Sequence, residues 1–114
     1  MTLNNFLSLL NSDLNKVQFT QSIQTIEANY NYSPTAFKNG DTQNESATNE
    51  GSCKIFAFAQ LNNLTQEQTL HCFGDYYRID VLQNLEGTDH ANIRNFIQSG
   101  WNGIKFDAVA LTLK

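Results

Sequence analysis

Hydrophobic residues recur at every third or fourth position along the N-terminal part of the chain, which is the period of one face of an α-helix. One such stripe runs over residues 2–17, and a second begins at Phe19 and reaches Tyr30. A later segment, Gly51 to Leu64, is apolar on nearly every side, and a helix of that composition is buried. The pattern therefore predicts two amphipathic helices and a central apolar helix over residues 52–64, around which the others pack.

Two signals mark the ends of the helix that follows. Thr65 and Gln68 have the spacing of a capping box, in which the threonine side chain accepts from the glutamine amide and the glutamine side chain reaches back. Gly74 predicts a break or kink, because glycine readily adopts the left-handed conformation that ends many helices. We expect Tyr76 and Val81 to contribute to the next apolar face.

The C-terminal residues alternate between hydrophobic and polar types, which is the period of a β-strand. The alternation starts at Ile104 and continues to Leu113. A single strand cannot satisfy its own backbone and needs a partner, for which the segment around Phe37 is the candidate. The sequence therefore predicts a small antiparallel strand pair near residues 35–38 and 103–107.

Two polar stretches separate these elements. Residues 39–50 contain one hydrophobic residue, Ala47, so we expect an exposed, mobile loop there. The second stretch reads "LEGTDH", and we expect Thr88 or Asp89 to cap a short helix that stops at Gly100.

The chain has 114 residues, the size of one ordinary domain, so a single domain covering residues 1–114 is expected. The fold class is expected to be mainly α (α+β), with about five helices packed round the central helix. Eleven acidic residues face seven basic ones, and the only arginines are Arg78 and Arg94. Nucleic acid and anionic membrane surfaces both require a basic stripe, so neither is an expected partner.

The two cysteines are too few for the disulfide framework of a small secreted protein, which favours reduced thiols in a cytoplasm. No stretch approaches the ~20 apolar residues that span a bilayer.

Seven segments stand along the chain in a fixed order and read "YSPTAFKNG", "NEGSCKIFAFA", "LTQEQTL", "CFGDYYR", "VL", "GTDHANIRNF" and "GWNGIKF". Taken together they resemble the HopJ type III effector family, and the resemblance covers residues 19–106. The chain departs from the family pattern at Ser46-Ala47, where Ala-Gly is usual, and at Leu85, where proline is usual.

This resemblance implies a bacterial protein with a role in virulence, made in the cytoplasm and secreted by a type III system. It brings no established enzymatic activity with it. We therefore expect a non-enzymatic interaction protein whose partner is a protein, with host proteins as candidates, and whose molecular target the sequence does not identify.

Cys53 supports an alternative, a small hydrolase or transferase. A helix start and the neighbouring Lys54 can lower a thiol pKa. His71 or His90 could then act as the base, with Asp89 orienting the imidazole. The competing interpretation is that Cys53 packs as a small buried residue at the start of the most apolar helix.

The binding candidates come from three clusters of aromatic, charged and imidazole side chains. Tyrosine, arginine and tryptophan are enriched in binding hot spots, and histidine and arginine four residues apart share a helical face. The alternatives are core packing of the aromatic rings and a surface ion pair between Asp75 and Arg78. The candidates are Asp75, Tyr76, Arg78, His90, Arg94 and Trp101.

A third hypothesis is a small-molecule binding module that uses the face carrying Tyr76, Arg78 and Arg94. No metal site is expected, because the adjacent His71 and Cys72 make a poor chelating pair, and no cofactor is expected either.

Overall fold

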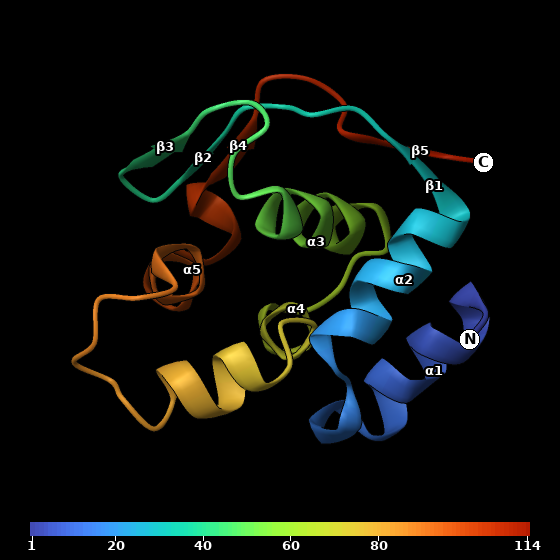
Figure 1. Cartoon of the computed structure of the whole chain (residues 1–114), viewed down its shortest axis with the longest axis horizontal. Helices are drawn as coiled ribbons and strands as arrows, with labels where there is room; N and C mark the ends of the chain where they lie inside the picture. The colour runs from blue at the N-terminus through green and yellow to red at the C-terminus, as the bar shows by residue number, and fades with distance from the viewer.

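The computed structural model describes every residue of the chain, 1–114, and Figure 1 shows it coloured from the blue N-terminus to the red C-terminus. The α-helices are α1 (Leu3–Ser12), α2 (Phe19–Asn29), α3 (Glu50–Leu61), α4 (Gln66–His71) and α5 (Ala91–Ser99). Three shorter helical segments supplement them: η1 (Leu14–Lys16) and η3 (Gly100–Gly103) are 3-10 turns, and η2 (Tyr76–Val81) is π-helical.

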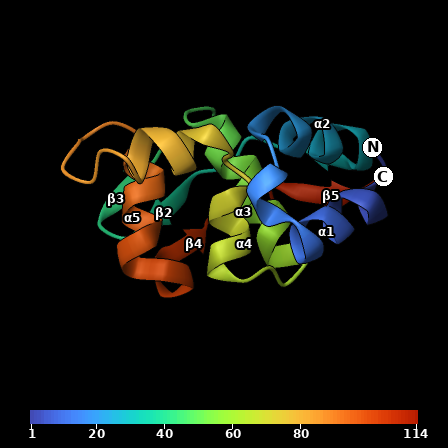
Figure 2. The ribbon, with the colours of Figure 1, turned by 90° about the horizontal axis from the view of Figure 1, so that it is seen from below.

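Short strands form two antiparallel sheets. One sheet pairs β1 (Tyr30–Tyr32) with β5 (Leu111–Leu113), and the other has the order β3-β2-β4 and consists of β2 (Phe37–Asn39), β3 (Thr42–Asn44) and β4 (Ile104–Phe106). Both sheets lie above α3 in Figure 1, and α4 lies below it. Seen from below in Figure 2, α5, α4 and α1 follow one another across the molecule. The predicted mainly helical α+β fold is confirmed, including the pairing of the Phe37 segment with β4.

The other elements enclose the middle of α3, as the all-round apolar pattern predicts, whereas Leu61 at its end is 53% exposed. The buried residues of α3 face every direction, and they are Cys53, Ile55, Phe56, Ala57, Phe58 and Ala59. A single ring, that of Phe56, contacts four other aromatic rings, with ring centroids between 5.0 and 6.5 Å apart. These rings belong to Phe37 of β2, Phe73 after α4, Phe96 of α5 and Trp101 of η3. Full burial of one such ring stabilises the fold by about 1.5–3 kcal/mol. The helix occupies residues 50–61 rather than 52–64, because Asn62 and Asn63 turn the chain toward α4.

The capping box and the glycine signals are also confirmed. The Thr65 hydroxyl accepts from the Gln68 amide at 3.1 Å, and the Gln68 side chain accepts from the Thr65 amide at 3.0 Å. Gly74 has φ +61° and separates α4 from η2, and Gly100 with φ +58° ends α5.

The first helix is shorter than its apolar stripe predicts. It ends at Ser12, because Asp13 has an extended φ of −157° and the chain continues as η1. Val17 is nevertheless buried. The stripe identified the core residues correctly but not the helix end, because a 3-10 turn can present the same side chains to the core.

The C-terminal alternation contains two strands rather than one. β4 ends at Phe106, and β5 starts at Leu111 and pairs with β1 in the other sheet. Val109 lies between the strands and is exposed. The two pairings are linked by backbone hydrogen bonds from Ser33 to Ala110 and from Asp107 to Ala36, so the chain between the strands stays close to the segment between β1 and β2.

The expectation of an exposed, mobile loop over residues 39–50 was wrong for residues 39–44. Gly40 turns the chain with φ +61°, and residues 42–44 return as β3, antiparallel to β2. Asn39 and Asn44 are buried, although neither is hydrophobic. None of the helices has the length and hydrophobicity that a membrane crossing requires.

Candidate functional site

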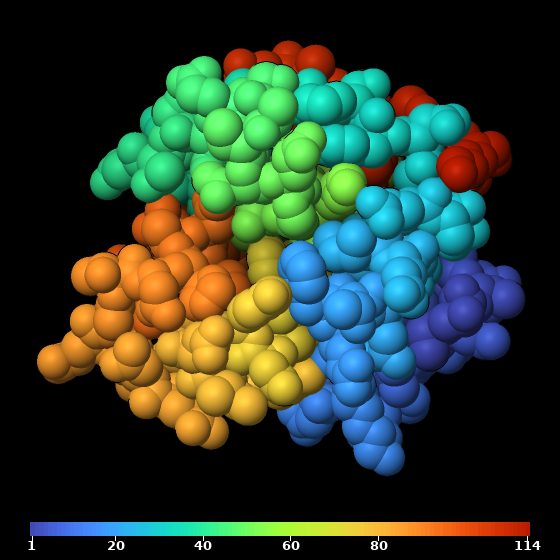
Figure 3. Space-filling view, in the orientation of Figure 1, coloured from blue at the N-terminus to red at the C-terminus, as the bar shows by residue number.

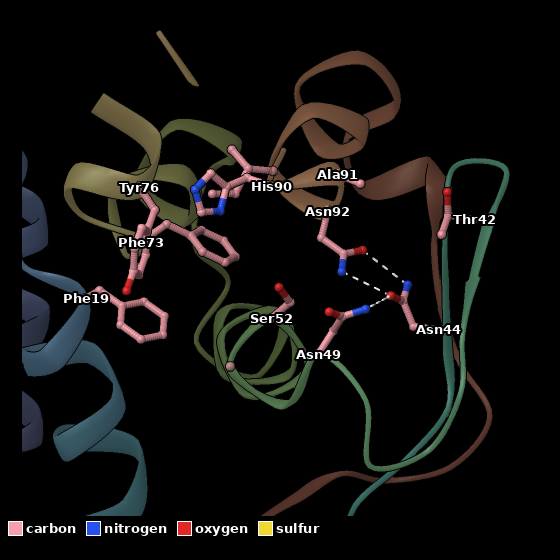
Figure 4. A pocket seen from close by; sticks show the side chains of 12 residues that line it. Phe19, Thr42, Asn44, Asn49, Ser52, Phe73, Tyr76, His90, Ala91 and Asn92 are labelled. Carbon is pink, nitrogen blue, oxygen red and sulfur yellow. Dashed lines mark hydrogen bonds between the residues drawn. The ribbon is translucent and has the colours of Figure 1, made fainter. Parts of the chain in front are cut away.

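A cleft of about 360 Å³ opens between β3, the starts of α3 and α5, and the segment around Tyr76. Figure 4 shows its lining side chains, and Figure 3 shows the face on which the green, orange and yellow segments meet around it. Asn44 and Asn92 form one side, and Phe19, Phe73 and Tyr76 form the other.

The polar side of the cleft is a cluster of asparagine amides. The side chains of Asn44 and Asn92 hydrogen-bond reciprocally, at 3.1 and 3.0 Å. Asn49 donates to the side-chain oxygen Oδ1 of Asn44 at 2.7 Å. Asn39 donates to the side-chain oxygen of Asn92 at 3.0 Å and to its backbone carbonyl at 2.8 Å. Only Oδ1 of Asn39 is left without a partner. Buried amides that satisfy one another in this way are rigid, so this side of the cleft has a fixed shape.

Both helices that start at the cleft have a left-handed residue as N-cap. Asn49 precedes α3 with φ 50°, and His90 precedes α5 with φ 52°. The expected cap at Thr88 or Asp89 was therefore wrong, and no side chain caps either helix. A non-glycine residue in this region is sterically strained and needs support from its surroundings. The bond from Asn49 to Asn44 and a bond from His90 to Asp80, at 3.0 Å, give that support.

The opposite wall is aromatic. Tyr76 lies between Phe19 and His90, with ring centroids 5.1 Å from each. Gly74 makes this arrangement possible, because a Cβ at that position would lie 2.6 Å from the backbone nitrogen of Phe19. The glycine therefore lets the start of α2 approach the start of η2, which brings Phe19 and Tyr76 to the same wall.

The cleft continues past Tyr76 into a second hollow of about 440 Å³. The two share Phe19, Phe73 and Tyr76 as lining residues. We call the second hollow the acidic groove, because Asp75 and Asp80 line it.

A charged cluster fixes the loop that leads into α5. The guanidinium of Arg94 donates to the Asp89 carboxylate at 2.6 Å and to the backbone carbonyls of Asn84 and Asp89. The hydrogen bond from Arg94 lowers the pKa of the Asp89 carboxyl below its usual range. Nε2 of His90 lies 3.8 Å from Oδ2 of Asp89 but 3.0 Å from Oδ2 of Asp80. The closer partner of the imidazole is therefore Asp80 and not Asp89, which the sequence had suggested.

Arg78 is turned inward. Its guanidinium donates to the backbone carbonyls of Leu14 and Val17, and Nη1 lies 3.0 Å from Nδ1 of His71. Burial, together with the positive charge of Arg78, lowers the pKa of His71. The expected ion pair with Asp75 is long, at 3.8 Å.

Cys53 is buried and is not hydrogen-bonded to either histidine. Its Sγ donates to the backbone carbonyl of Thr35 at 3.5 Å, whereas the nearest polar partners of His71 and His90 are Arg78 and Asp80. Burial raises the pKa of the Cys53 thiol, which is the reverse of what a nucleophile needs.

The remaining candidates lie apart from the cleft. Trp101 is half-buried against Phe96, with ring centroids 5.0 Å apart. Cys72 is buried, and burial raises the pKa of its thiol to about 12. No group of three or more His, Cys, Asp and Glu side chains is arranged to hold a metal ion.

The structure thus brings Asp75, Tyr76 and His90 to the cleft and the acidic groove, but turns Arg78 and Arg94 toward backbone carbonyls. Sequence reasoning missed the asparagine cluster. The available signal was the turn pair Asn39-Gly40, followed at strand spacing by Thr42 and Asn44.

Replacing Asn92 with alanine should destabilise the protein. The change removes one hydrogen-bond acceptor from each of two buried side-chain amides, Asn39 and Asn44, and an unsatisfied buried polar group costs about 1–3 kcal/mol. We expect the free energy of unfolding, measured by urea titration, to fall by about 2–3 kcal/mol. Asn102→Ala, at an exposed position, is the control and should change it by less than about 0.5 kcal/mol. Equal effects of the two variants would contradict a structural role for the cluster.

Cys53 should react with iodoacetamide only after unfolding. Its burial and raised pKa leave almost no accessible thiolate in the native protein at neutral pH. Peptide mapping by mass spectrometry after labelling with and without urea measures the reaction at each cysteine. Rapid labelling of native Cys53, with Cys72 unmodified, would revive the thiol-enzyme alternative.

Comparison with known proteins gives one family and one solved structure. The family model described as HopJ type III effector protein matches residues 3–111. The crystal structure of the unknown function protein VPA0580 superposes with a TM-score of 0.99 at 53% sequence identity, covering 100% of this chain and 95% of that chain. No curated protein matches the chain. Because the family model spans nearly the whole sequence, the chain belongs to the HopJ type III effector protein family.

Proposed function

We propose that this protein is a type III effector-like interaction protein, without enzymatic activity, that binds a partner protein through the cleft beside Tyr76. The observation that carries the proposal is a fixed cleft with one hydrogen-bonded amide side and one aromatic side. Aromatic side chains at the centre of a cleft supply much of the binding free energy in protein complexes.

The rigidity of the cleft supports binding. The side chains of Asn44 and Asn92 are already held in place, and Tyr76 is fixed between two other rings, so a partner needs to order few groups when it binds. Preorganisation of this kind increases affinity, because less conformational entropy is lost.

The chemistry of the candidate nucleophile also supports binding over catalysis. Cys53 has a raised pKa, and its thiol points to a backbone carbonyl. Nucleophilic catalysis by a cysteine requires a base within hydrogen-bond reach, and both imidazoles have other partners.

A small-molecule binding module is the second candidate. The cleft volume of about 360 Å³ favours it, because small-molecule pockets span roughly 300–1,000 Å³. Both candidate functions use the aromatic wall of the cleft. They are distinguished by whether the immobilised protein retains a protein or a small molecule from an extract.

Replacing Tyr76 with alanine should strongly reduce the amount of partner that the immobilised protein retains. We expect at least a tenfold loss, about 1.4 kcal/mol, because the variant removes the ring between Phe19 and His90. The measurement is quantitative mass spectrometry of material eluted from the immobilised protein after incubation with host-cell extract.

Ile79→Ala is the matched control. Tyr76 and Ile79 lie on the same segment and are 44% and 46% exposed, but Ile79 lines neither hollow. Material that is retained equally by both variants would contradict the proposal.

The proposal includes synthesis in the bacterial cytoplasm and export through a type III system, with a host protein as the candidate partner. Family membership supports this route. A fusion of residues 1–20 to a reporter should be secreted by a type III-competent strain and retained by a strain that lacks the apparatus. Retention in both strains would count against export through this segment.

A further inference from the structure

The acidic groove combines carboxylates with aromatic rings. Asp75 and Asp80 line it together with Phe19, Phe73 and Tyr76, and its volume is about 440 Å³. The T-shaped pair of Phe19 and Tyr76, with centroids 5.1 Å apart, leaves aromatic surface beside the carboxylates.

Both carboxylates are accessible to a partner. The Asp75 side chain is 76% exposed, and its nearest cation, Arg78, is 3.8 Å away. The Asp80 side chain is 43% exposed and uses Oδ2 for its bond with His90. Asp75 therefore has no partner closer than 3.8 Å, and the structure shows no side-chain partner for Oδ1 of Asp80.

The basic groups nearest the groove are committed to the protein interior. The side chains of Arg78 and Arg94 are 17% and 15% exposed, and both donate to backbone carbonyls. No lysine occurs between residues 75 and 89, whereas Glu86 adds a further acidic group to that segment. The charge that this segment presents to solvent is therefore negative.

We infer that the acidic groove binds a lysine or arginine side chain of a basic segment in the partner protein. The inference rests on the proposed function and names the chemistry of the partner at that site. Asp75 and Asp80 pair with the cationic group, and the ring of Tyr76 contacts it through a cation–π interaction. Charge complementarity selects this occupant, because an acidic segment would meet two exposed carboxylates without compensation.

The test uses three fluorescein-labelled peptides in which glycine alternates with lysine, arginine or acetyl-lysine. Fluorescence anisotropy should show that the lysine and arginine peptides bind and that the acetyl-lysine peptide binds at least tenfold more weakly. The double variant Asp75→Asn/Asp80→Asn should weaken binding of the two basic peptides at least tenfold, and Tyr76→Ala should weaken it as well.

The double variant Asp41→Asn/Glu45→Gln is the matched control. It makes the same change in net charge at exposed positions of the 39–50 segment, and it should change affinity less than twofold. Thermal melting of each variant verifies that it is folded. Equal losses in the two double variants would overturn the inference, because the peptides would then respond only to net charge.

The two proposals fail in different ways. If no basic peptide binds while extract material is still retained and lost in Tyr76→Ala, the cation inference is wrong and the binding function stands. If Tyr76→Ala retains the material as well as Ile79→Ala does, the cleft is not the binding site and both proposals fail.

Discussion

The burial of the middle of α3, residues 55–59, on all sides is the constraint on which the rest of the structure depends. A helix segment without a polar face has to be covered, and four aromatic rings from other segments of the chain converge on Phe56 to cover it. The cleft is therefore a consequence of core packing, because its position follows from the elements that enclose α3.

A network of polar side chains fills the part of the interior that hydrophobic residues do not occupy. Between β3 and α5 the interior contains asparagine amides in place of apolar side chains, and their hydrogen bonds join a hairpin to a helix fifty residues later in the chain. Directional bonds fix orientation more narrowly than apolar contacts do. The left-handed residues Asn49 and His90 stand at the edge of this network, where bonds from their side chains offset their backbone strain.

The distribution of surface charge follows from the hydrogen bonds that each arginine side chain makes. Arg78 and Arg94 donate to backbone carbonyls of turns and loops, and this use withdraws both guanidinium groups from the surface. Asp75 and Asp80 remain accessible beside Tyr76. A chain of modest net charge, −4, thereby acquires a locally acidic hollow next to aromatic rings.

Hydrophobic periodicity determined the fold class and the central helix, and the spacing of Thr65 and Gln68 determined the capping box, because these depend on neighbours within a few residues. The periodicity did not reveal the end of α1, the second C-terminal strand or the buried asparagines, because hydrophobicity does not register buried hydrogen bonds between distant polar residues. The sequence also could not show which side Cys53, Arg78 or His90 would face. Only the tertiary structure decided that Cys53 packs against a carbonyl and that Tyr76 and His90 share one wall, because each contact joins segments whose distance is set by the complete core.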